Sequence, residues 1–171
     1  MAISLYDLCV PSYLQVLDSV GQVMQKGEQY AQDNGVDLGD IVETRLREDM
    51  LPFHFQVVSV MHHSRGAIEG AEAGLFTPPP SLELDYAGLQ ALVGEAATAL
   101  RARSPDEVNA LEGKSMLFRA GDFELPFSAE NFITSFSLPN FYFHATTTYA
   151  ILRMAGVPLG KMDYLGQLRA G

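Results

Sequence analysis

Apolar residues recur every three or four positions through most of this chain, which is the spacing of an amphipathic α-helix. In residues 5–34 the recurring positions are Val10, Tyr13, Leu14, Leu17, Val20, Val23 and Met24. Asn34-Gly35 supplies a helix stop, and Pro11 suits a first turn or would kink the helix. The pattern therefore predicts a first long helix over this stretch.

Two further stretches show the same spacing. Residues 49–74 are predicted as a second long helix, ended by the sequence "GLFTPPP"; its apolar stripe is Met50, Phe53, Val57, Val60, Met61, Ser64, Ala67, Ile68 and Ala71. Residues 85–103 are predicted as a third helix, with a short helical turn after it in "SPDEVNAL". Its buried face would carry Leu89, Leu92, Ala96 and Leu100.

The pattern changes once, to alternation around Gly121-Asp122, which predicts a strand pair over residues 116–126. Ser128 is a good N-cap for "SAENFITSF", and a last long helix is expected from Pro139 through Arg153. The fold class predicted is all-α with four principal helices, and at most a small β-hairpin before the last one. No repeat or linker divides residues 1–171, so a single domain is expected.

Composition narrows the possible partners. The chain has 171 residues, is 47% hydrophobic and carries a net charge of −10, from 11 Lys and Arg against 21 Asp and Glu. This charge repels nucleic acid and anionic membranes, and no Lys/Arg run offsets it, so neither is an expected partner. The single cysteine, Cys9, suggests packing rather than a disulfide or a zinc site. Without a signal-like or membrane-length apolar run, a cytoplasmic location is predicted.

Candidate chemistry first appears on the second predicted helix. Asp49, Gln56 and His63 are spaced by seven residues and so form a narrow polar strip beside the apolar stripe, from which His62 points away. Such a strip can line a pocket between helices. Alternatively, Asp49 is an N-cap, Gln56 a satisfied buried amide and His63 a boundary residue.

The last helix offers two faces. His144 and Thr148 share one with Ile151, and the other carries Tyr149, Arg153, Tyr142 and Thr146. Phenols beside a guanidinium can hold an anionic ligand, but the same set also suits an interface or an Arg–carboxylate pair. We expect His144 and the polar strip to face a common cavity, with Tyr149 and Arg153 near its rim.

The stretches "RLREDMLPFHFQV" and "NFYFHATTTYAILRMAGVPLGKMDYLG" resemble the DUF1993 family, within the DinB/YfiT-like superfamily, and the likeness covers nearly the whole chain. The resemblance implies an up-down-down-up four-helix bundle, commonly a homodimer. Superfamily relatives include metal-dependent thiol S-transferases and a mycothiol-dependent isomerase. They typically carry one metal-binding histidine on the second helix and an H-x-x-x-H pair on the last.

Matched to that pattern, His63, or less readily His62, takes the first position and His144 opens the pair, but Thr148 stands where the second histidine is expected. A threonine hydroxyl is a poor ligand for zinc or nickel, although Asp49 can complete a set if the fold brings it close. The favoured function is a small-molecule-binding or vestigial-site homodimer with no complete metal site and no cofactor.

The alternative is a zinc- or nickel-dependent thiol transferase or hydrolase-like enzyme with His63, His144 and Asp49 as ligands. In the favoured case His144 is a buried histidine, hydrogen-bonded to a neighbour such as Tyr149 or Asp49. The C-terminal "GVPLGKMDYLG" is expected to dock back onto the helices through Tyr164 and Leu165.

Overall fold

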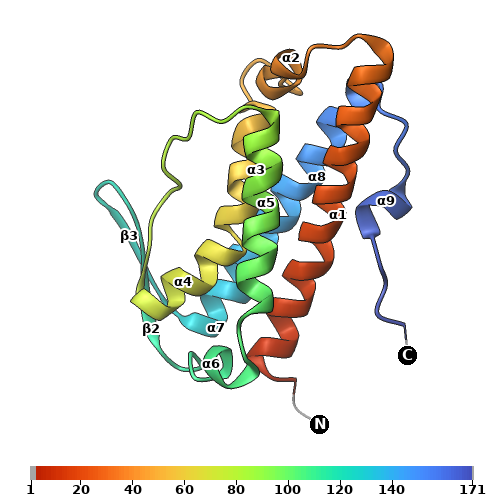
Figure 1. Ribbon diagram of the computed structural model, residues 1–171. Coiled ribbons are helices and arrows are strands. Elements are labelled where there is room, and N and C mark those ends of the chain that lie inside the picture. Colours follow the sequence, from red (N-terminus) through yellow and green to blue (C-terminus); the bar gives the residue numbers. More distant parts are fainter. Residues whose placement is uncertain (1–2, 171) are drawn as a thin grey trace.

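The computed structural model describes residues 3–170, which form a mainly helical structure with one small sheet (Figure 1). The longer helices are α1 (Leu5–Asn34), α3 (Phe53–His62), α4 (Arg65–Ala73), α5 (Tyr86–Arg101) and α8 (Leu138–Met154). The shorter ones are α2 (Leu38–Glu43), α6 (Pro105–Asn109), α7 (Ala129–Phe132), the π-helical η1 (Ile133–Ser137) and α9 (Lys161–Leu165). The strands are β1 (Leu75–Phe76), β2 (Ser115–Ala120) and β3 (Phe123–Ser128).

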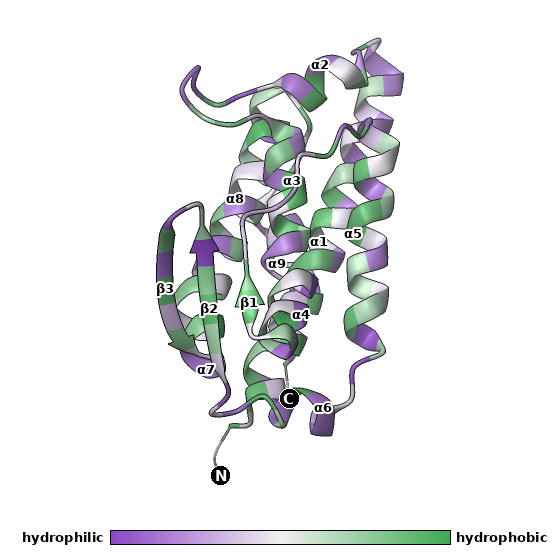
Figure 2. Ribbon diagram, turned by 90° about the vertical axis from the view of Figure 1, so that its left-hand side faces the viewer, coloured by the Kyte–Doolittle hydropathy of each residue, from purple (hydrophilic) through white to green (hydrophobic). Residues whose placement is uncertain are grey.

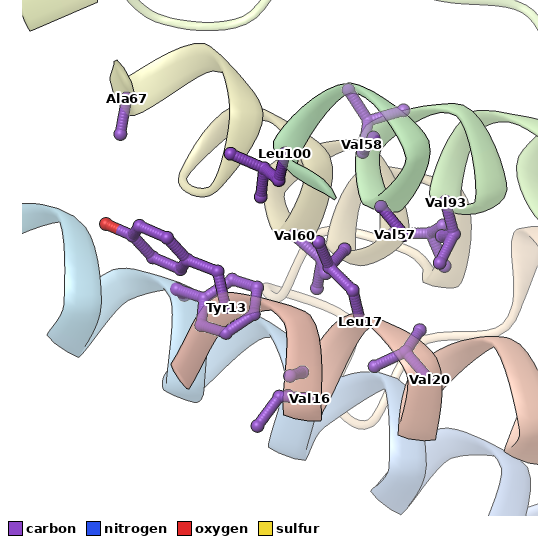
Figure 3. Close-up of a cluster of buried hydrophobic side chains, with 14 of the residues drawn as sticks. Tyr13, Val16, Leu17, Val20, Val57, Val58, Val60, Ala67, Val93 and Leu100 are labelled. Carbon is purple, nitrogen blue, oxygen red and sulfur yellow. The ribbon is translucent and has the colours of Figure 1, made fainter. Parts of the chain in front are cut away.

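The hydrophobic core lies among four of these helices. α1 packs against α5 and α8, and α3 packs against the same two helices. Figure 3 shows part of this core, where apolar side chains of α1, α3 and α5 meet; among them are Leu17, Val20, Val57, Val60 and Val93. None of the described helices is long and apolar enough to cross a membrane.

The first helix follows its prediction closely. The Ser4 hydroxyl accepts a hydrogen bond from the Asp7 backbone N–H at one end, and Gly35 ends the helix with φ of 66°, a conformation that favours glycine. Pro11 lies in the second turn rather than the first. Cys9 is buried in the core, and burial raises the pKa of its thiol to about 12, which suits packing and not nucleophilic chemistry.

The length predicted for the second helix was wrong. It begins at Phe53 because Pro52 lacks an N–H and disfavours helical geometry in Leu51, so residues 49–51 stay outside it. It is also broken after His62. Ser64 adopts φ −117° and ψ −86°, and its hydroxyl donates to the carbonyls of Val60 and Met61, a side-chain bond that competes with regular helix geometry.

The sheet is larger than the predicted hairpin. β2 and β3 pair antiparallel across Gly121, whose φ is 59°, and β1 adds a third strand parallel to β2. A strand of two residues is too short to show alternation, which is why the sequence pattern missed it. The three strands lie together along one side of the helices (Figure 2).

The last helix is joined to its predecessor without a break. α7, η1 and α8 follow one another directly, with Pro139 at the start of α8. Ser128 lies at the N-cap position of α7, yet its side chain makes no capping hydrogen bond. The sequence pattern predicted two separate pieces here because a π-helical turn shifts the helical repeat between them.

Candidate functional site

The contact between α3 and α8 brings two of the predicted residues together. His144 Nδ1 lies 2.8 Å from Gln56 Oε1, and Gln56 Nε2 donates to the carbonyl oxygen of Leu51 at 2.8 Å. Because the amide nitrogen is held by a carbonyl, the amide oxygen must face the histidine, which can satisfy it only with an N–H at Nδ1. His144 Nε2 of the neutral ring therefore carries a lone pair.

His63 lies beside this pair, directly after the last residue of α3. Its ring stacks on that of His144, with centroids 5.8 Å apart and planes at 12°, and the rings of Phe76 and Phe136 enclose it. His63 Nδ1 is buried and has no hydrogen-bond partner among the described residues. Leaving a buried polar atom unpaired lowers the free energy of unfolding by about 1–3 kcal/mol, so this nitrogen destabilises the fold.

A buried hydrogen-bond chain holds the break between α3 and α4 in place. Ser137 Oγ donates to the carbonyl oxygen of His63 at 2.6 Å, and Tyr13 Oη lies 2.6 Å from Ser137 Oγ. Since the serine hydrogen is already used, Tyr13 is the donor in the second bond. Sequence reasoning missed Ser137, because its position depends on the π-helical turn, and it treated Tyr13 only as an apolar residue.

Both histidines are neutral at neutral pH. Burial lowers the pKa of His63 to about 3, with smaller contributions from His62 and His144 nearby. Burial alone lowers the pKa of His144 to about 4. The site therefore offers uncharged imidazoles, which hydrogen-bond to neutral groups or bind metals but do not attract anions.

The remaining candidates for a metal set are not in position. Thr148 is buried and its hydroxyl donates to the carbonyl oxygen of His144 at 2.9 Å, within its own helix. Asp49 is exposed on the turn before α3, because that helix starts at Phe53. Within residues 3–170 no three His, Cys, Asp or Glu side chains are grouped to hold a metal. The donor set present, two imidazoles, does not fit the three-ligand pattern of the superfamily.

Tyr149 and Arg153 lie on another side of α8 from His144. The Tyr149 ring packs against Tyr164 of α9, with centroids 6.0 Å apart. Arg153 is exposed and its Nη1 donates to the carbonyl oxygen of Val157 at 3.2 Å, after the end of the helix. These two residues therefore contact the C-terminal segment, not the Gln56–His144 pair.

The C-terminal segment docks on α1, on the opposite side of the helices from the sheet (Figure 1). Ser19 Oγ lies 2.6 Å from the carbonyl oxygens of both Asp163 and Tyr164, and Lys26 Nζ lies 2.5 Å from Asp163 Oδ1. Gly160 is the N-cap of α9, and its N–H donates a hydrogen bond to the Asp163 carboxylate. The "KMDYLG" motif thus has a local structural role.

Comparison with known families agrees with the resemblance seen in the sequence. The family model described as "Domain of unknown function (DUF1993)" matches residues 5–165. The chain belongs to the DUF1993 family. No curated protein matches this DUF1993 chain.

A solved structure supports the wider relationship. The DUF1993 chain is similar to a DinB family member protein from Shewanella denitrificans, with 26% sequence identity and a TM-score of 0.79. The match covers 98% of this chain and 94% of the other. The predicted DUF1993 membership is therefore confirmed, and the mainly helical fold with its small sheet is similar to that of a DinB family member.

Proposed function

We propose that this protein binds an uncharged small molecule at the α3–α8 contact, through Gln56, His63 and His144, without a complete metal site. The observation that carries the proposal is the His144–Gln56 hydrogen bond, which leaves a lone pair on His144 Nε2, in a ring stacked on that of His63, whose Nδ1 is unpartnered. Buried polar atoms without partners are uncommon in folded proteins and often mark a binding role.

The proposal includes an architecture and an assembly. We propose a single domain over residues 1–171 with the up-down-down-up four-helix topology of DinB-like proteins, acting as a homodimer in the cytoplasm. The mutual packing of α1, α3, α5 and α8 and the similarity to a DinB family structure support the topology. Light scattering should give twice the chain mass of 18.7 kDa, and a mass of one chain at micromolar concentration would contradict the dimer.

Metal content tests the proposed site directly. Purified protein mixed with excess zinc or nickel and then desalted should retain well under one metal ion per chain. The variant His144→Ala should lower the free energy of unfolding by about 1–3 kcal/mol, because the buried Gln56 amide loses its partner. Its metal content should not change. His54→Ala, on the partly exposed side of α3, is the matched control for unspecific histidine binding.

One observation favours the alternative, a zinc- or nickel-dependent thiol transferase or hydrolase-like enzyme. His63 and His144 are stacked neighbours, and each has a ring nitrogen without a hydrogen-bond partner among the described residues. A metal held by His63, His144 and Asp49 requires Asp49 to move from its exposed turn. Stoichiometric zinc or nickel that is retained on desalting and lost in His144→Ala would establish this alternative and refute our proposal.

A further inference from the structure

Aromatic rings form a continuous row from the hairpin to the outer surface of α8. Successive ring centroids along the row lie 6.3, 4.9, 5.7, 5.8 and 5.2 Å apart. The row passes through the two histidines of the proposed site. In order, its members are Phe123, Phe118, Phe136, His63, His144 and Phe143.

Both ends of this aromatic row are open to solvent. Phe123 is 57% exposed and Phe143 is 56% exposed, whereas His63 at the middle is buried. Leu125 lies on the same face of the hairpin as Phe123, because it pairs with Phe118 across the strands. The other face of the hairpin carries the Arg119–Glu124 ion pair. The row is therefore exposed at its two ends and buried in its middle, and the charged pair of the hairpin lies on the opposite face from Phe123.

Next to the exposed Phe143 end of the row, the partly buried His144 supplies a defined polar atom. The Gln56 contact places the N–H at Nδ1, so Nε2 can only accept a hydrogen bond, and none of the described residues donates to it. Phe143 and Phe55 flank the His144 ring edge to face, at 5.2 and 5.9 Å. A partly buried acceptor between two aromatic side chains is suited to a flat ring that carries a donor.

Resting on the proposed function, we propose that the ligand is an uncharged aromatic molecule with a hydroxyl or ring N–H, which donates to His144 Nε2 and packs on Phe143 and Phe55. Anionic ligands fit poorly, because no cationic side chain belongs to the row and the chain carries a net charge of −10. Cationic ligands also lack a partner, because no carboxylate pairs with His63 or His144 in the described residues. A single hydrogen bond and ring packing remain as the means of recognition.

Phenol, toluene and benzoate separate these contributions. Titrated into the intact protein and followed by the ¹⁵N resonances of the imidazoles, phenol should shift His144 Nε2 in a saturable way. Toluene should bind about tenfold more weakly, since one hydrogen bond is worth about 1–1.5 kcal/mol. Benzoate should cause no shift. Equal affinities for phenol and toluene would overturn the assignment of His144 Nε2 as the acceptor.

Surface variants test the aromatic contact without disturbing the core. Phe143→Ser replaces an exposed ring and should weaken phenol binding about twofold to tenfold, which corresponds to the usual value of an aromatic contact, about 0.5–1.5 kcal/mol. Met154→Ser is the matched control, because Met154 lies on the same helix, is 53% exposed and is not part of the row. Equal phenol affinity in Phe143→Ser and Met154→Ser would refute the proposed contact.

The two proposals fail in different ways. If toluene binds as tightly as phenol, the hydrogen-bond donor of the ligand is wrong while a metal-free site for an uncharged molecule remains. If benzoate, but not phenol, shifts His144 Nε2, the site prefers an anion, and both proposals are wrong. If none of the three compounds shifts the resonance and the protein holds stoichiometric zinc or nickel through His144, the proposed function itself is wrong.

Discussion

The α1–α5 contact and the α3–α8 contact both pack helices in the core, but they differ in the polarity of their buried side chains. Where α1 and α5 meet, the buried side chains are mainly aliphatic, as Leu17, Val20, Val93 and Leu100 illustrate (Figure 3). The helices α3 and α8, by contrast, carry buried polar residues, namely Gln56, Ser59, Thr147 and Thr148, and buried His63 directly follows α3. The α1–α5 contact therefore relies on apolar burial, whereas the α3–α8 contact depends on hydrogen bonds being satisfied.

The difference is the reason for proposing a binding site at the α3–α8 contact. Burying amides and imidazoles weakens a helix contact unless each polar atom has a partner, and His63 Nδ1 has none in the described residues. The same side of the molecule has the interrupted α3–α4 helix and the π-helical turn η1. Irregularities of this kind cluster at functional sites because regular packing would be more stable.

The largest expected effect is in the apolar contact. Leu17→Ala should lower the free energy of unfolding by about 2–5 kcal/mol, because it leaves a cavity among fully buried side chains. Urea unfolding followed by circular dichroism measures this loss. The imidazole resonances of the folded variant should stay unchanged. A shift of the His144 resonance in Leu17→Ala would show that the two contacts are coupled and would break the comparison.

Acid should weaken the polar contact selectively. The pKa of His63 is lowered in the folded state to about 3, from an ordinary value of 6.5, so below pH 6.5 the unfolded chain binds the proton more readily. Stability therefore falls as the pH drops from 6.5 towards 3. This residue should account for a loss of about 3 kcal/mol at pH 4.

The variant His63→Gln isolates this contribution from that of the carboxylates. Its free energy of unfolding, measured by urea titration between pH 7 and pH 4, should fall less steeply than that of the unchanged protein. Parallel pH profiles would mean that the pKa of His63 is not lowered in the folded state.

Removing the glutamine should sharpen the comparison further. Gln56→Leu leaves the His144 Nδ1–H without an acceptor and should lower the free energy of unfolding by about 1–3 kcal/mol. The ¹⁵N spectrum should also show a different tautomer balance at His144. Gln22→Leu, at an exposed position of α1, is the matched control and should change neither property. Unchanged His144 resonances in Gln56→Leu would contradict the tautomer assignment.

The smallest effect is expected at the surface near the apolar contact. Arg101 Nη2 lies 2.5 Å from Asp18 Oδ1 and joins α5 to α1, but both side chains are about half exposed. Arg101→Met should change the free energy of unfolding by at most about 1 kcal/mol, the usual range for exposed ion pairs. Thermal unfolding in low and high salt measures this effect. A loss of several kcal/mol would mean that the ion pair, and not apolar burial, holds α1 to α5.

The amino-acid sequence by itself determined that the fold is mainly helical and which residues form the core. Helical spacing placed Leu17 and Val57 on buried faces, Asn34-Gly35 ended the first helix, and alternation around Gly121 located the hairpin. These features depend on neighbours within a few residues, so a local pattern is enough to predict them. The seven-residue spacing also selected Gln56 and His63 as neighbours on one face.

Only the tertiary structure decided which candidate residues meet. Asp49 lies outside the polar strip because Pro52 delays the start of α3. Tyr149 contacts the C-terminal segment because α9 docks beside it. The acceptor on His144 follows from an amide held by a carbonyl, and the position of Ser137 follows from a π-helical turn. The position of Asp49 follows from the neighbouring Pro52, a local signal that the helical spacing alone did not include. The contacts of Tyr149, His144 and Ser137 join residues far apart in the chain, whose geometry no local spacing specifies.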